Sequence, residues 1–262
     1  MFRDERIYRA IMFSSPSVRD LNAARGLLPK KAISKAAPPI KCPHGSIEHW
    51  FYYSPNAFTR NIDLLKEVTE KRNGVTQYRY NLYLIGMTQG KTFSIMLAVP
   101  FLKMAKELYS HVRSETRGKD FEFNRILMNR AFELSKKGED SAALLKITRV
   151  KYNIEGDGFA ESVGFVGSHL AQCATLGSLM KGLEGPKLTP ERVRLSMDDR
   201  LSFDTDQLGH YWFNVSKNAD NLQFLPDVFR MLAQLKLVEA NSAFPHMRHF
   251  DATDSEVNQS NE

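Results

Sequence analysis

Cysteine is scarce in this sequence, with only Cys42 and Cys173 among 262 residues. Small secreted domains usually depend on several disulfides, so two cysteines favour a reducing, cytoplasmic compartment. Long hydrophobic runs are also missing: the longest apolar stretch, residues 93–104, is interrupted and falls short of the roughly 20 residues that span a bilayer. The first residues lack the apolar core of a secretory signal. We therefore expect a cytoplasmic protein with no membrane partner.

Acidic residues are in short supply in the first part of the chain. Residues 1–150 hold 26 lysine and arginine residues against 14 acidic ones, a net charge of +12. Residues 151–262 hold 10 against 16, a net charge of −6. A basic region of this size is typical of proteins that bind a polyanion, most often nucleic acid. We expect RNA or DNA as the main partner, with protein partners in a larger assembly.

The composition is that of a globular protein, with 42% hydrophobic and 25% charged residues. The predicted fold class is α+β, a largely antiparallel sheet with helices packed on one face. We divide the chain into a basic α+β region (1–150), a smaller acidic α+β region (151–240) and a disordered tail (241–262). The chain is long enough for one domain or two small ones.

Period-two and helical spacings of apolar residues predict most elements of the first region. Strands are expected at residues 6–14 and 47–53, and an exposed basic loop at 29–44, where four prolines accompany four lysines. A hairpin is expected from residues 75–85 and 91–99, joined by the loop 86–90. Helices are expected at 15–28, from Ser54-Pro55 to Asn73-Gly74, from 102 to 112 and over 120–136.

The second region gives weaker patterns. Residues 143–154 predict a strand, and residues 160–185 fit strand and helix equally well. A second hairpin is expected from residues 194–203 and 208–215, with Asp204 to Asp206 in its loop. A helix near 224–237 closes the predicted fold.

The segment from Gly86 to Thr92 resembles the Walker A loop of P-loop nucleotide hydrolases, in which backbone amides and a lysine, here Lys91, hold phosphates. This segment has three residues between its glycines where that family has four, and an alternating strand pattern follows where that family has a helix. The differences favour a hairpin loop with an exposed lysine. Lys91→Ala should then leave the fold intact.

The segment Gly164-Phe-Val-Gly167 is similar to the dinucleotide-binding turn of extended short-chain dehydrogenases. It has Glu161 where that family has a further glycine, and a carboxylate at this place would repel a phosphate. The same spacing is similar to the nucleic-acid loop of KH domains, although that loop is usually basic and lies between two helices. Both patterns are better explained as a turn at the end of a strand.

Two further groups contain residues that bind metals or act as nucleophiles. Cys42, His44 and His49 lie close together, but their spacing fits no standard zinc site. His246 and His249 fall in the expected tail. Cys173 follows His169 by four residues, and its small apolar neighbours indicate packing rather than catalysis.

An acidic cluster, Asp198, Asp199, Asp204 and Asp206, is the best metal candidate in the sequence. Carboxylates hold magnesium in enzymes that cleave phosphodiesters, so a metal-dependent nuclease with Mg²⁺ at Asp204 and Asp206 is an alternative function. A solvated hairpin loop explains the same residues. A protein–protein adaptor is a third hypothesis.

The leading hypothesis is a nucleic-acid-binding protein without chemistry of its own. Arginine and tyrosine on one face of a strand can contact phosphate and stack a base, and a lysine-rich loop can follow a backbone. The residues that we expect to contact nucleic acid are Lys30, Lys31, Lys35, Lys41, Arg79, Tyr83 and Lys91.

Overall fold

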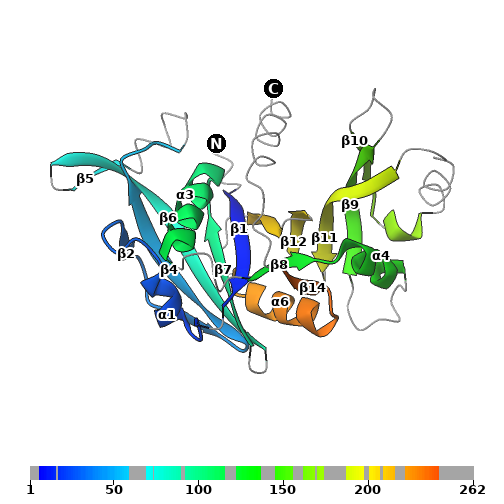
Figure 1. Ribbon diagram of the computed structural model, residues 1–262, viewed down its shortest axis with the longest axis horizontal. Coiled ribbons are helices and arrows are strands. Elements are labelled where there is room, and N and C mark those ends of the chain that lie inside the picture. The colour runs from blue at the N-terminus through cyan, green and yellow to red at the C-terminus, as the bar shows by residue number, and fades with distance from the viewer. Residues whose placement is uncertain are drawn as a thin grey trace.

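A 14-stranded antiparallel sheet with helices on both faces forms the body of the protein (Figure 1). The structure is a computed structural model, and it describes residues 6–15, 17–58, 69–72, 74–89, 92–115, 122–136, 145–155, 162–168, 170–173, 187–197, 201–206, 209–215 and 222–241. The antiparallel α+β class is therefore confirmed.

Ten strands follow one another across the sheet in the order β10-β9-β11-β12-β13-β1-β7-β6-β4-β2. Their bounds are Arg6–Ser14 (β1), Ile33–Lys35 (β2), Gly45–Ser54 (β4), Val75–Gln89 (β6), Thr92–Val99 (β7), Leu145–Glu155 (β9), Ser162–Val166 (β10), Lys187–Met197 (β11), Leu201–Asp206 (β12) and His210–Val215 (β13). Four short strands branch from this path. They are Ile40–Cys42 (β3, on β4), Thr69–Arg72 (β5, on β6), Glu122–Ile126 (β8, on β1) and Val238–Asn241 (β14, on β8).

Strand β1 joins the two parts of the sheet, because it pairs with β7 on one side and with β13 on the other. Ile11 and Phe13 are buried on one face, and Ala10 and Met12 are buried on the opposite face. A strand that is covered on both faces needs apolar residues at successive positions, which explains why the central part of β1 does not alternate.

Helices α1 (Leu21–Gly26) and α3 (Leu102–Glu115) pack on one face, which we call the α3 face. Asp20 caps α1, since its Oδ1 accepts a hydrogen bond of 2.8 Å from the Ala23 amide. Leu108 of α3 and Leu97 of β7 belong to the core of this face.

Helices α4 (Met128–Lys136) and α6 (Leu225–Gln234) and the 3-10 helix η2 (Leu170–Gln172) contribute to the core on the opposite face, which we call the α6 face. The expectation of helices on one face only is therefore wrong. The physical reason lies in the central strands: Met96 and Ala98 of β7 are as buried as Ile95 and Leu97, so apolar side chains need cover on both faces.

Several predicted elements are confirmed: the strands at 6–14 and 47–53, the hairpin of β6 and β7, and the helices near 102–112 and 224–237. Other predictions are corrected. The segment expected as a basic loop contains β2 and β3, which both pair with β4. The expected helix over 120–136 is the strand β8 followed by α4.

The helix expected before Asn73-Gly74 is partly wrong. Residues 59–68 lie outside the described part of the chain, but Thr69–Arg72 forms β5, and Arg72 pairs with Val75 of β6. Gly74 has a positive φ of 77°, as a tight hairpin turn requires. An Asn-Gly pair is typical of helix ends and also of hairpin turns, and here β5 and β6 form a hairpin.

The sheet is continuous across the two predicted regions. Residue 150 lies inside β9, which pairs with β10 and β11, so the boundary at 150 does not coincide with the end of an element. Asn241 still belongs to β14, and residues 242–262 lie outside the described part.

Candidate nucleic-acid interface

Four basic side chains lie side by side on β9 and β11. Lys151 is opposite Arg192, and Arg149 is opposite Arg194, so all four share the α3 face. We call them the cationic ladder. Arg149 is exposed, and the other three are partly exposed. Like charges directly opposite each other on neighbouring strands destabilise a sheet, and here two such pairs are adjacent.

Two carboxylates neutralise part of this charge. The Glu191 Oε2 atom lies 3.2 Å from the Lys151 ammonium. Asp204, on β12, accepts hydrogen bonds from Arg194 Nε (3.2 Å) and Nη2 (2.7 Å) and from Arg192 Nη2 (3.3 Å). Asp204 is 5% exposed, so the two arginines replace most of the water that a carboxylate needs.

Trp212 of β13 extends the site toward the centre of the sheet. Its ring lies 4.5 Å from the guanidinium carbon of Arg192 and 5.5 Å from that of Arg9 on β1. Both distances suit cation–π contacts. Because Trp212 is 6% exposed, it positions the two guanidinium groups rather than offering a free ring face to a ligand.

Asp206 and His210 lie where β12 turns into β13. The His210 amide donates to Asp206 Oδ1 (3.1 Å), and its ring Nδ1 lies 2.6 Å from Oδ2. The expectation that Asp204 and Asp206 form a solvated loop is wrong, since both belong to strand β12. Among the described residues, no three His, Cys, Asp or Glu side chains are grouped closely enough to hold a metal ion. Asp198 and Asp199 lie outside that part of the chain.

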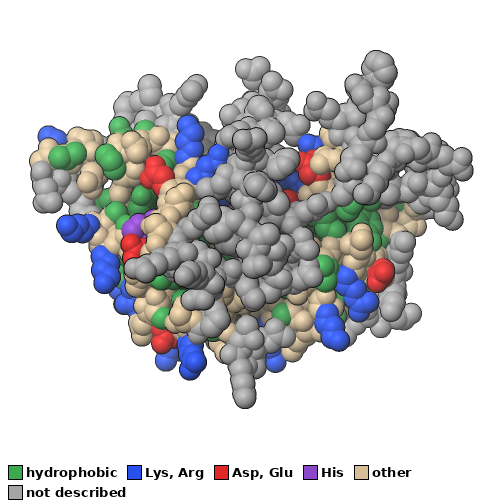
Figure 2. Space-filling model, viewed as in Figure 1, with side chains coloured by type: hydrophobic (Ala, Val, Ile, Leu, Met, Phe, Trp, Pro, Cys, Tyr) green, Lys and Arg blue, Asp and Glu red, His purple; other side chains and the backbone are tan. Residues whose placement is uncertain are grey.

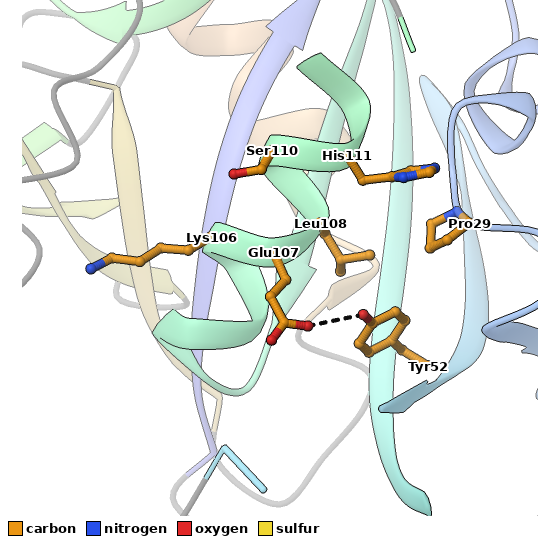
Figure 3. A pocket seen from close by; sticks show the side chains of 7 residues that line it. All are labelled: Pro29, Tyr52, Lys106, Glu107, Leu108, Ser110 and His111. Atoms are coloured by element: carbon orange, nitrogen blue, oxygen red, sulfur yellow. Dashed lines mark hydrogen bonds between the residues drawn. The ribbon is translucent and has the colours of Figure 1, made fainter. Parts of the chain in front are cut away.

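A groove of about 450 Å³ opens on the same face, between α3 and the turn at Pro29 (Figure 3). Figure 3 shows Glu107 and His111 extending toward Tyr52 and Pro29, whereas the Lys106 and Ser110 side chains extend from the other side of the helix. The lining is completed by Leu108.

Glu107 is held in place at this groove. Tyr52 Oη donates to Glu107 Oε2 (3.2 Å), and Asn56 Nδ2 donates to Oε1 (3.4 Å). Burial and the negative charge of Glu107 both raise the pKa of Tyr52, so its hydroxyl stays protonated and keeps donating.

The predicted lysines Lys30, Lys31, Lys35 and Lys41 lie along one edge of the sheet, on and before the strands that pair with β4. Lys30 and Lys31 follow Pro29, while Lys35 on β2 and Lys41 on β3 lie opposite residues of β4. All four are exposed. Figure 2 shows Lys and Arg side chains along this rim, over the part where Figure 1 shows α1 and β2. Lys91 lies outside the described residues.

Arg79 and Tyr83 share one face of β6, as expected, but it is the α6 face, away from the ladder. His49 stacks on Tyr83 with ring centroids 4.6 Å apart, and its Nε2 lies 3.0 Å from Asn81 Oδ1. The Arg79 guanidinium lies 4.7 Å from the centre of the Phe51 ring. The structure therefore brings Arg79 and Tyr83 together with aromatic side chains of β4, and not with the four lysines.

The other motifs have structural explanations. Gly86 lies in β6, not in a loop, and a Cβ atom there would come within 2.8 Å of the Phe93 ring and 2.9 Å of Leu21. Close packing against Phe93 and Leu21 thus explains why position 86 is a glycine. Gly164 lies in β10, and the three-residue η2 follows where the dehydrogenase turn has a helix. His44 contacts Arg230 of α6.

Sequence reasoning missed the ladder. Three of its members, Lys151, Arg192 and Arg194, belong to the region of net charge −6, so a regional average hides them. The available signal was local: Arg149-Val-Lys151 and Arg192-Val-Arg194 repeat basic residues with period two in two strands, which places each pair on one face.

No family model matches the chain, and no curated protein matches it. In the described part of the chain, no helix combines the length and apolar character needed to cross a membrane.

Proposed function

We propose that the protein binds nucleic acid along its α3 face, with the cationic ladder contacting phosphates. The main support is that two like-charged pairs, Lys151 with Arg192 and Arg149 with Arg194, lie opposite each other on β9 and β11. Such pairs cost stability in the free protein. A polyanion that lies over both strands offsets the repulsion and gains charge-assisted hydrogen bonds from arginines.

The charge of the site supports a polyanion rather than a neutral ligand. Among the described residues, the ladder supplies four positive charges, and the carboxylates paired with it are Glu191 and Asp204. Each carboxylate already faces a basic partner, so the surplus positive charge remains for a ligand. Arginines that a carboxylate holds in one orientation lose less entropy when they bind a phosphate.

The exposed lysines at the edge of the sheet, Lys30, Lys31, Lys35 and Lys41, extend the proposed surface. Lys35 and Lys41 lie on the α3 face by their register opposite β4, and Lys103 is exposed on α3 itself. A strand that crosses this face meets basic side chains at both ends, while α3 lies between them. This arrangement supports binding of a backbone without sequence preference at these contacts.

We do not advance the nuclease hypothesis, because Asp204 is occupied by two arginines and Asp206 by His210. The two arginines at Asp204 oppose the binding of a divalent cation there. The adaptor hypothesis stays a prediction.

A charge reversal on the ladder tests the proposal. Arg149→Glu places a carboxylate opposite Arg194, so we expect a slightly more stable fold, by about 0.2–0.5 kcal/mol, and weaker binding of labelled RNA or DNA in fluorescence anisotropy. Arg130→Glu on α4 has the same change in net charge and serves as the control. Equal binding by the Arg149 and Arg130 variants would remove the ladder from the interface.

A further inference from the structure

The groove between α3 and Pro29 combines an apolar wall with one fixed acceptor group. Tyr52, Leu108 and Pro29 supply the apolar surface, and Glu107 supplies the carboxylate (Figure 3). A mostly apolar cavity with few, well-placed polar groups is typical of small-ligand sites, and about 450 Å³ lies within their usual range.

A carboxylate inside the groove repels phosphate, and the ammonium of Lys106, which also lines the groove, extends away from Tyr52 and Pro29 (Figure 3). The groove therefore suits the uncharged part of a nucleotide. Phosphate is expected outside, at Lys30 and Lys31, which are exposed directly after Pro29. The carboxylate in the groove and the lysines outside it therefore favour a nucleotide with its base inside the groove and its phosphate outside.

The hydrogen bonds of Glu107 narrow the choice of base. Tyr52 and Asn56 each donate to a different oxygen of the carboxylate, which fixes its plane and leaves a second lone pair on each oxygen. Two parallel acceptors match an edge with two adjacent N–H donors. Among the common bases, only guanine presents such an edge, through N1–H and the N2 amino group.

The other bases fit this carboxylate less well. Adenine and cytosine each present one amino group beside a ring nitrogen that accepts hydrogen bonds, and uracil presents one N–H between two carbonyl groups. In each case an acceptor faces a carboxylate oxygen. An unpaired, repelled acceptor in a site costs far more than a missing contact.

We propose that this groove binds one unpaired guanine, with the Glu107 carboxylate on its N1–H and N2–H₂ edge. The partly buried His111 ring, which extends toward Pro29, provides a surface on which the base stacks. The inference rests on the proposed nucleic-acid binding, because it names the base that the same face reads.

Calorimetry with the four 5′-mononucleotides tests the inference directly. The wild-type protein should bind GMP about ten-fold more tightly than AMP, CMP or UMP, the size of preference that one bidentate base contact gives. Glu107→Gln keeps one acceptor oxygen but adds donors, so it should abolish the preference. Glu115→Gln, near the end of the same helix, should keep it.

Either of two calorimetric results would overturn the guanine site: equal binding of GMP and AMP by the wild-type protein, or an unchanged preference in Glu107→Gln. The first needs no variant, so a folding defect cannot obscure it. Salt-dependent binding of oligonucleotides without base preference would refute the guanine site alone. Failure to bind any oligonucleotide, with GMP still preferred, would refute the ladder proposal and leave the groove as a nucleotide site.

Discussion

Asp204 holds two of the four residues of the cationic ladder, because it accepts three hydrogen bonds from Arg192 and Arg194. Asp204→Asn should destabilise the protein by about 2 kcal/mol. This is less than the about 3–5 kcal/mol for breaking a fully buried pair, since the arginine side chains are 20% and 28% exposed. Urea denaturation measures the change. A loss within about 0.5 kcal/mol would mean that Asp204 behaves as an ordinary surface residue.

The two cysteines differ in environment and should differ in reactivity. Burial, and then the negative charge of Asp227, raise the pKa of Cys42, whereas Cys173 is exposed. Because the thiolate is the reactive form, Cys173 should react with a thiol reagent faster than Cys42 in the native protein.

Single-cysteine variants, Cys42→Ser and Cys173→Ser, assign the two rates. Because the pKa of Cys42 is raised, its labelling rate in Cys173→Ser should increase only at a pH above the usual range of a thiol. Faster labelling of Cys42 would show that its surroundings differ from those described.

At the scale of single residues, the sequence shows which side chains are charged but not which of them meet. Arg79 and Tyr83 were predictable as neighbours because one strand holds both. The contact of Arg192 and Arg194 with Asp204 depends on the register between β11 and β12. The expected hairpin treats residues 194–203 as one strand and places Asp204 in a loop, so it does not include this pairing. A shift of register changes every cross-strand pair, so such contacts are not accessible from local patterns.

Glycines control how closely the elements pack at the base of α6 and α1. A Cβ atom at Gly45 would come 2.1 Å from the Gly86 carbonyl oxygen and 3.0 Å from Pro226 Cβ. Gly45→Ala should therefore cost at least the about 1–3 kcal/mol typical of overpacking, because backbone must move. Gly86→Ala should cost less, since the atoms it meets belong to the Phe93 and Leu21 side chains.

The matched control is Gly26→Ala in α1. Beyond its chain neighbours and its own helix backbone, no described atom lies within 4 Å of a Cβ at this position, so alanine should be neutral or stabilise by up to about 1 kcal/mol. Thermal unfolding of the three variants gives the order. A Gly45 variant as stable as the Gly26 variant would contradict the packing at α6.

At the scale of elements, long periodic segments were predictable and ambiguous signals were not. Residues 75–85 and 91–99 alternate clearly, and they form β6 and β7. The predicted loop 86–90 is wrong, because β6 continues to Gln89. Glycines such as Gly86 and Gly90 are typical of a turn, and this is why the sequence predicts a loop there. Thr69–Arg72 pairs with β6, and tertiary pairing of this kind overrides helical spacing.

At the scale of the whole molecule, the division of the sequence into a basic and an acidic region does not follow the strands of the sheet. The boundary at 150, drawn from charge, crosses β9, and the ladder combines Arg149 with residues of the acidic region. The α+β fold class and the antiparallel pairing were predictable from the strands that alternate polar and apolar residues. The position of the basic surface did not, because it depends on which strands become neighbours in the sheet.

The most direct test of the central claim is the salt dependence of nucleic-acid binding. If the ladder contacts phosphates, log affinity should fall linearly with log salt, with a slope of about 0.7–0.9 per phosphate contact. In Arg149→Glu/Lys151→Glu the magnitude of the slope should decrease by about two, while Arg130→Glu keeps the wild-type slope. Affinity that does not change with salt, or an unaltered slope in the double variant, would contradict nucleic-acid binding through the cationic ladder.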